Sequence, residues 1–301
     1  MHVAARLGGQ VRAALPTGLE EVLTRYAKSA DAATNDDIRR HMVRNLVDLR
    51  TYIYEVIHVA GMTWLSNHYG VTNHAAFLGL IGETFGQTES VAIVTFNYDT
   101  LIENAITKVT GWEYGHLNTY PGGTFKLFKL HGSTTWGREL DIGWTGENTS
   151  RVQDAITDAL LARGNVISSR YARWEGASTN GHYWVPAIAV PLLDKPDFEC
   201  PQAHIDELVG LLPQVDRVIT IGWRGQESAF LDLLDHDLPV GGVPLDVVGT
   251  SNAQEVAKRL ALQARISETG FNSDGFSGLV GSCTRIGRVA RHDEFNVATT
   301  A

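Results

Sequence analysis

SVAIVTFNYDTLIE, residues 90–103, decides the fold class of this chain. Its first seven residues form a short run rich in β-branched side chains and bounded by polar ones, which is typical of a buried parallel strand. Helical spacing resumes from Thr100 to Thr107, so residues 90–108 predict a strand, a tight turn and a helix. This is half of a βαβ unit, and Asn97 lies at the end of its strand.

The alternation of strands and helices continues downstream. TFKLFKL at 124–130 is the next predicted strand, and it runs directly into HGS. Further strands are predicted at 182–191, 216–222 and 244–250, with helices at 150–164, 203–212, 226–236 and 252–264. This spacing predicts an α/β fold: a doubly wound parallel (Rossmann-like) sheet with flanking helices.

Helical patterns also precede the first strand. LPTGLEEVLTRYA at 15–27 predicts a helix with a capping box between Thr17 and Glu20. Apolar spacing from Asp36 to about Asn67 predicts one long helix, or two with a break at Gly61. A further helix is predicted at 73–85.

We expect residues 1–301 to form a single α/β domain. The least regular stretch, 136–185, is predicted to be a small inserted helical or irregular module, or a lid. The segment from Ile266 predicts a short edge strand, and residues 290–301 a frayed tail.

Composition limits the function classes. The chain has 301 residues, 44% of them hydrophobic and 20% charged, which is typical of a globular protein. Its formal net charge of −9 argues against nucleic acid as the primary partner, although backbone N–H groups at helix N-termini can still bind a small phosphorylated molecule.

Two cysteines, Cys200 and Cys283, supply neither a disulfide framework nor a four-cysteine zinc site, so a reducing compartment and no metal are expected. No apolar run reaches the roughly 18–20 residues that span a bilayer. These features predict a cytoplasmic protein with no membrane partner.

Polar residues at predicted strand ends are the candidate site, because ligands of open parallel sheets bind outside the carboxyl ends of the strands. Three segments qualify: TFNYDTLIE at 95–103, KLHGSTTW at 129–136, and IGWRGQE at 221–227 together with VGTSN at 248–252. Taken alone, Asp99 is as readily a helix cap, and His131 is more often a structural histidine. Their convergence with Asn97 at neighbouring strand ends favours a functional site.

The order and spacing of NYD, HG, IGW and VGTSN resemble the sirtuin-like domain family, over about residues 15–285. This resemblance implies an NAD-binding Rossmann-type sheet, with NAD as the substrate. It implies catalytic roles for Asn97, which would contact the nicotinamide ribose and order a water molecule, and for His131, which would act as general base. The implied cofactor-binding residues are Asp99, Gly132, Gly222, Trp223, Thr250, Ser251 and Asn252, although the last three could equally cap the helix that follows them.

The chain departs from the family in two places. The zinc module of sirtuin deacylases needs four cysteines, so the resemblance is to bacterial sirtuin-like domains that hydrolyse NAD, many of them in antiphage defence. The usual glycine-rich loop after the first strand also lacks a clear copy, and LGG at 7–9 could be its degraded remnant. A misassigned start codon, a genuine truncation or a non-catalytic relative would each explain this; we favour the first, because the later motifs look intact.

The leading hypothesis is therefore an NAD glycohydrolase (NAD+ nucleosidase) that releases nicotinamide and ADP-ribose. The alternative is a non-catalytic regulatory module that binds NAD or ADP-ribose, and a zinc-free NAD-dependent protein deacylase ranks third. Control by homo-oligomer formation or by a separate regulatory partner is expected from the resemblance.

Overall fold

The computed structural model describes residues 19–85, 90–120, 122–140, 149–161, 167–174, 183–189 and 198–297. Its helices are α2 (Leu19–Ala32), α3 (Asp36–Asn67), α4 (Asn73–Phe85), α5 (Leu101–Thr110), α6 (Thr149–Leu161), α7 (Gln202–Leu211), α8 (Ser228–Asp237), α9 (Ala253–Ala261) and α10 (Gly275–Ile286). Short 3-10 turns are η1 (Leu117–Thr119), η2 (Leu212–Gln214) and η3 (His292–Glu294). Its strands are β1 (Val91–Thr95), β2 (Phe125–Lys129), β3 (Gly132–Leu140), β4 (Ile167–Arg173), β5 (Tyr183–Ile188), β6 (Val218–Ile221), β7 (Val243–Val248), β8 (Ile266–Asn272) and β9 (Asn296–Val297).

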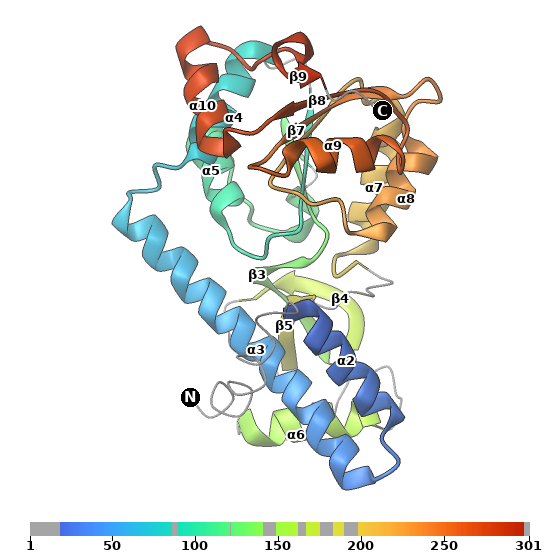
Figure 1. Ribbon diagram of the computed structural model, residues 1–301. Coiled ribbons are helices and arrows are strands. Elements are labelled where there is room, and N and C mark those ends of the chain that lie inside the picture. The colour runs from blue at the N-terminus through green and yellow to red at the C-terminus, as the bar shows by residue number, and fades with distance from the viewer. Residues whose placement is uncertain are drawn as a thin grey trace.

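Parallel strands form the upper part of the molecule in Figure 1. β1 pairs with β2 in parallel, from Val91 opposite Phe125 to Thr95 opposite Lys129. β6, β7 and β8 are parallel neighbours, and β9 closes that sheet with an antiparallel pairing to β8. Helices flank these strands, so the predicted mixed α/β class with parallel strands is confirmed.

A second, antiparallel sheet lies below these strands, in the order β4-β3-β5. The sequence analysis wrongly placed residues 182–191 in the parallel sheet, since β5 pairs antiparallel with β3. Within the range 136–185, predicted as a helical or irregular module, the helix expected at 150–164 is present as α6, whereas the end of β3 and the whole of β4 were not predicted. The physical reason is that β3 pairs with β4 and β5, which are distant from it in sequence. The apolar periodicity of a single segment does not reveal such pairing.

Helix α3 is a single helix that runs from the lower part of the molecule to the upper part (Figure 1), with no break at Gly61. Asn35 caps it by accepting the N–H of Ile38 at 3.0 Å. Its first half packs against α6, where Arg44 forms an ion pair with Asp154. Helix α6 is thus held by α3.

The main core lies between the parallel strands and the helices around them. Among its deeply buried side chains are several from β2, α5, α7 and α10: Leu127, Phe128, Ile106, Leu208, Leu279 and Cys283. Side chains of β7 and α9 form an adjoining cluster. Burial of this apolar surface is the main term that stabilises the fold.

The C-terminal segment differs from its prediction. β8 is not an edge strand, because β9 covers its outer side, and GFSGLVGSCTRI at 275–286 is the helix α10. Residues 292–297, expected within a frayed tail, form η3 and β9. Buried Phe295 and the paired Arg288 and Glu294 side chains hold this segment in place.

Candidate functional site

The turn after β1 carries the NYD motif and is fixed by local hydrogen bonds. The Thr95 hydroxyl accepts the N–H of Asn97 at 3.1 Å, and the Asp99 carboxylate accepts the N–H of Leu101 at 3.0 Å. Asp99 thus caps the first N–H of α5 from the position before the N-cap residue, Thr100, whose own side chain makes no capping hydrogen bond. The Asn97 side chain is exposed, whereas Asp99 is half-buried.

The HG motif follows β2 and is held by backbone contacts. The N–H of Leu130 donates to the Thr95 carbonyl at 3.1 Å, and the N–H of Ala189 donates to the His131 carbonyl at 2.9 Å. Gly132 has φ +85°, and a Cβ there would lie 1.9 Å from the Ala187 carbonyl oxygen. Only glycine fits this position, and it directs the buried His131 beside the turn that follows β1.

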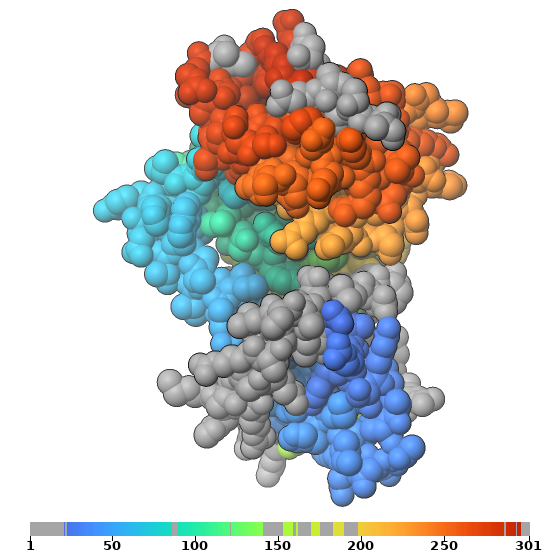
Figure 2. All heavy atoms as spheres, in the orientation of Figure 1, coloured from blue at the N-terminus to red at the C-terminus, as the bar shows by residue number. Residues whose placement is uncertain are grey.

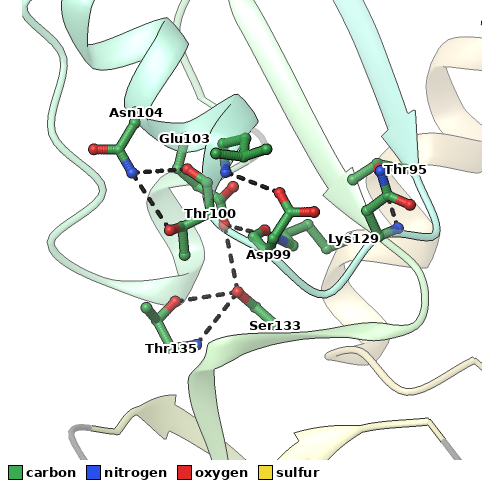
Figure 3. Close-up of polar contacts among 10 residues, drawn as sticks. Thr95, Asp99, Thr100, Glu103, Asn104, Lys129, Ser133 and Thr135 are labelled. Carbon is green, nitrogen blue, oxygen red and sulfur yellow. Dashed lines mark hydrogen bonds and ion pairs between the residues drawn. The ribbon is translucent and has the colours of Figure 1, made fainter. Parts of the chain in front are cut away.

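A buried ion pair joins the two motifs (Figure 3). The Lys129 ammonium lies 2.8 Å from Glu103 Oε1 and also donates to the Asp99 carbonyl. Lys129 is 1% exposed and Glu103 is 6% exposed. The pair therefore fastens the end of β2 to the NYD turn and to the first turn of α5, and so sets the position of Asp99 relative to His131.

Hydroxyl groups extend this network toward β3. The Ser133 hydroxyl lies 3.4 Å from Glu103 Oε1 and 3.2 Å from the Thr135 hydroxyl. The other Glu103 oxygen, Oε2, is buried with no hydrogen-bond partner among the described residues. Burial and the negative charge of Glu103 raise the pKa of the nearby phenols of Tyr114 and Tyr120 well above the ordinary value.

An aromatic cluster connects this region with the end of β6. Phe96 lies 4.9 Å from the His131 ring and stacks on Trp223 at 5.7 Å, measured between ring centroids. Phe230 of α8 packs edge-on against both Phe96 and Trp223. The carboxyl ends of β1, β2 and β6 therefore lie next to one another.

A cavity of about 450 Å³ opens at the carboxyl ends of β6 and β7, beside the start of α10. Five predicted cofactor-binding residues line it: Gly222, Trp223, Thr250, Ser251 and Asn252. Its wall continues through Arg224 and through Gly275 and Phe276 of α10. Helices α9 and α10 both begin at this cavity, and neither has a side-chain hydrogen bond at its N-cap.

The predicted site residues thus fall into two neighbouring groups. Asn97, Asp99, His131 and Gly132 lie at the ends of β1 and β2, and the other five surround the cavity. Trp223 links the groups, since it lines the cavity and stacks on Phe96. The expected glycine-rich loop remnant at 7–9 lies outside the described residues.

Sequence reasoning missed His74, in the first turn of α4. Burial lowers the pKa of His74, against the opposing effect of the Asp99 carboxylate, and its ring lies 5.2 Å from Phe276 in the cavity wall. It also assigned no role to Phe96 and Arg224, although both lie within the quoted segments TFNYDTLIE and IGWRGQE.

These features define a mixed α/β protein with a cavity at the carboxyl ends of its parallel strands. No protein-family model matches the chain, and no curated protein resembles it closely enough to be a relative. Within the described ranges no cluster of three His, Cys, Asp or Glu side chains could hold a metal ion. No helix in the described part of the chain is both long and apolar enough to cross a membrane.

Proposed function

We propose that this chain is an NAD glycohydrolase of the sirtuin-like type, which cleaves the bond between nicotinamide and ribose. The observation that carries the proposal is a cavity lined by backbone glycine, hydroxyl groups and two helix N-termini. Ring contacts of Phe96 with Trp223 in the cavity wall and with His131 connect this cavity to the HG motif. We also propose that the parallel strands have the doubly wound, Rossmann-like arrangement that such an enzyme would use to bind NAD.

The adenosine half of NAD suits the cavity at β6 and β7. Its volume of about 450 Å³ falls in the range of small-molecule sites, roughly 300–1,000 Å³. Gly222 has φ +68°, and no atom lies within 4 Å of a Cβ built there, so a ligand can approach the backbone. Uncapped N–H groups of α9 and α10, together with Arg224, favour a phosphorylated ligand.

The nicotinamide ribose would lie at the NYD turn and His131. The reaction breaks the bond between nicotinamide N1 and ribose C1′ and forms a bond from C1′ to a water oxygen. The proton released by that water would pass to a base, and a neutral imidazole such as that of His131 can accept it near neutral pH. The exposed Asn97 amide would position the ribose and the water.

The test is HPLC measurement of NAD, nicotinamide and ADP-ribose. The assay uses the 301-residue chain and a version extended upstream to include a glycine-rich loop. Asn97→Ala is expected to lower the rate about 100-fold or more, as is typical for the loss of a positioned polar group. Asn104→Ala is the matched control, since this exposed asparagine bonds only within the first turn of α5.

His131→Ala is expected to lower the rate to a similar extent, with folding checked by circular dichroism because His131 is buried. If NAD stayed intact with both versions of the wild-type chain under every condition tried, the enzyme proposal would fail.

A non-catalytic module that binds NAD or ADP-ribose is the second candidate. It is favoured by two observations: the Asp99 carboxylate is already engaged in capping α5, and Asn97 does not line the cavity. Calorimetry with ADP-ribose would support this candidate if affinity were unchanged in His131→Ala and no variant hydrolysed NAD. Absence of binding to the wild-type chain would exclude it.

A further inference from the structure

Tyr98 is the middle residue of the NYD motif, and hydrogen bonds hold it at two points. Its backbone carbonyl accepts the N–H of Thr134 in β3 at 2.8 Å. Its hydroxyl donates to the carbonyl of Ala189, directly after β5, at 2.7 Å. Figure 2 shows the blue-green segment of the NYD turn and α5 recessed between the light-blue end of α3 and the orange segments above it. Tyr98 therefore connects this enclosed turn to two strands of the antiparallel sheet.

Ala189 also contacts the HG motif. Its N–H donates to the His131 carbonyl at 2.9 Å, while its own carbonyl accepts the Tyr98 hydroxyl. Ala189 is buried, and so are the two residues before it, Ala187 and Ile188. The end of β5 thus bonds to both motifs, and it fixes the position of Tyr98 relative to His131.

The Tyr98 ring packs beside the imidazole of His131. Their centroids lie 6.4 Å apart with 31° between the ring planes, and the Phe96 ring lies 4.9 Å from the same imidazole. Both separations fall within the roughly 4.5–7 Å at which aromatic rings pack. Phe96 has no hydroxyl, so of these two rings only that of Tyr98 is anchored at its far end by a hydrogen bond.

This anchoring bears on the orientation of the imidazole. The positive φ of Gly132 and the bond from Ala189 fix the backbone at His131, but such backbone contacts do not set the two side-chain torsions of a histidine. Contacts with neighbouring side chains select the rotamer. A general base must stay within about 0.5 Å of its productive geometry, and a displacement of about 1 Å can cost roughly 100-fold in rate. A ring that is held at both ends is therefore suited to orient His131.

We propose that Tyr98 is a positioning residue, which fixes the His131 imidazole by linking the NYD turn to the end of β5. The inference rests on the proposed function, because it gives Tyr98 a part in the same site. Tyr98 acts through His131 and is not a catalytic residue, since its hydroxyl is engaged by Ala189. The antiparallel sheet then contributes to the reaction, because the end of β5 supplies the carbonyl on which this arrangement depends.

Tyr98→Phe tests the hydroxyl, because it keeps the ring and removes only the hydrogen bond to Ala189. In whichever version of the chain hydrolyses NAD, we expect kcat to fall about 10-fold, since His131 is less well oriented in the transition state. KM for NAD is expected to change less than about 2-fold, because Tyr98 does not line the cavity at β6 and β7.

Tyr171→Phe is the matched control. The Tyr171 hydroxyl also donates a hydrogen bond, to Glu199 at 3.2 Å, and its ring lies under Arg138 at 5.0 Å rather than beside His131. This variant loses a comparable hydrogen bond away from the site, so kcat is expected to stay at the wild-type value. Thermal unfolding of both variants checks that their losses of stability are similar. An equal fall of kcat in Tyr171→Phe would attribute the effect to destabilisation and overturn the proposal.

NMR of the histidine rings gives a readout that needs no turnover. The chain is produced with isotope-labelled histidine, and the His131 signals are assigned by their absence in His131→Ala. Because phenylalanine retains an aromatic ring at position 98, a shift or broadening of these signals in Tyr98→Phe reports movement of the imidazole. We expect that change in Tyr98→Phe and none in Tyr171→Phe.

These measurements separate the inference from the proposed function. Movement of the His131 signals in a chain that hydrolyses no NAD would support the role of Tyr98 while the enzyme proposal fails. An active wild-type chain with unchanged kcat and unchanged His131 signals in Tyr98→Phe would overturn the role of Tyr98 and leave the enzyme proposal intact. A rise in KM with kcat unchanged would also overturn it, because Tyr98 would then bind the substrate.

Discussion

Lys129 and Glu103 form the buried ion pair on which the geometry of the candidate site depends. Removing one partner from such a pair leaves a charge in a low-dielectric interior, which costs about 3–5 kcal/mol. We therefore expect Lys129→Met to lower the free energy of unfolding by that amount, measured by urea denaturation, because Glu103 would remain buried without its cation.

The double variant Lys129→Met with Glu103→Leu is the control for this prediction. Replacing both charges by apolar side chains of similar volume removes the unpaired charge, so stability is expected to recover most of the loss. A single variant as stable as the wild type would show that the pair does not hold β2 to the NYD turn.

Gly132 and Gly61 give opposite expectations for the same substitution. At Gly132, alanine would place Cβ against the Ala187 carbonyl oxygen at a positive φ, so Gly132→Ala should destabilise the fold severely. At Gly61, within α3, no atom lies within 4 Å of the added Cβ, so Gly61→Ala should raise stability by about 0.5–1 kcal/mol. Thermal unfolding of both variants checks the contrast, and equal effects would contradict it.

Elements with strong local patterns were predictable from the sequence. β1 and α5 follow from the change in apolar period across residues 90–108, and β2 from the run that ends at His131. β3 was missed because GSTTWGREL has no clear alternation and depends on pairing with β4 and β5. α10 was missed because its glycines and serines are poor helix formers, and the burial of Leu279 and Cys283 overrides that preference.

The candidate site was predictable to the level of strand ends but not of contacts. The rule that ligands bind beyond the carboxyl ends of parallel strands located Thr250 and Ser251, and the structure places both in the cavity wall. The contact of Phe96 with Trp223 joins residues distant in sequence, and no local pattern encodes it. The same holds for the pairing of Lys129 with Glu103.

Helix α7 is tied to η1 by a buried histidine, which makes its attachment sensitive to acid. His204 is 2% exposed, and its Nε2 lies 2.8 Å from the Leu117 carbonyl. Burial lowers the pKa of His204 below its ordinary value of 6.5, so the unfolded chain binds the proton more readily than the folded one. The contribution of His204 to the free energy of unfolding is therefore complete above about pH 6.5. It is lost as the pH falls through the lowered pKa that His204 has in the folded protein.

His204→Gln should keep a donor for the Leu117 carbonyl while removing the titrating group. We expect the dependence of unfolding free energy on pH below 6.5 to become shallower, by up to about 1.4 kcal/mol per pH unit. Urea denaturation at a series of pH values measures this slope. The same slope in both proteins would mean that His204 is protonated equally in the folded and unfolded states.

At the scale of the whole molecule, Glu199 joins the antiparallel sheet to the parallel part. Its carboxylate contacts Arg138 of β3 and Tyr171 of β4, just before α7 begins. Burial, reinforced by the Glu199 charge, raises the pKa of the neighbouring Cys200 thiol to about 12. The antiparallel sheet and the parallel strands are therefore joined at Glu199 and by the long helix α3. Because of these connections, we expect the two parts to unfold together.

The two cysteines allow this cooperativity to be measured. Cys200 lies at the junction before α7 and Cys283 lies in α10, yet both belong to the same buried cluster. Both thiols are buried, so neither cysteine should react with a thiol reagent in the folded protein. If that cluster opens as one unit, modification of both cysteines, followed by mass spectrometry as urea is raised, should show the same midpoint. Earlier labelling of Cys200 would instead show that the junction opens while the α10 side of the core stays folded.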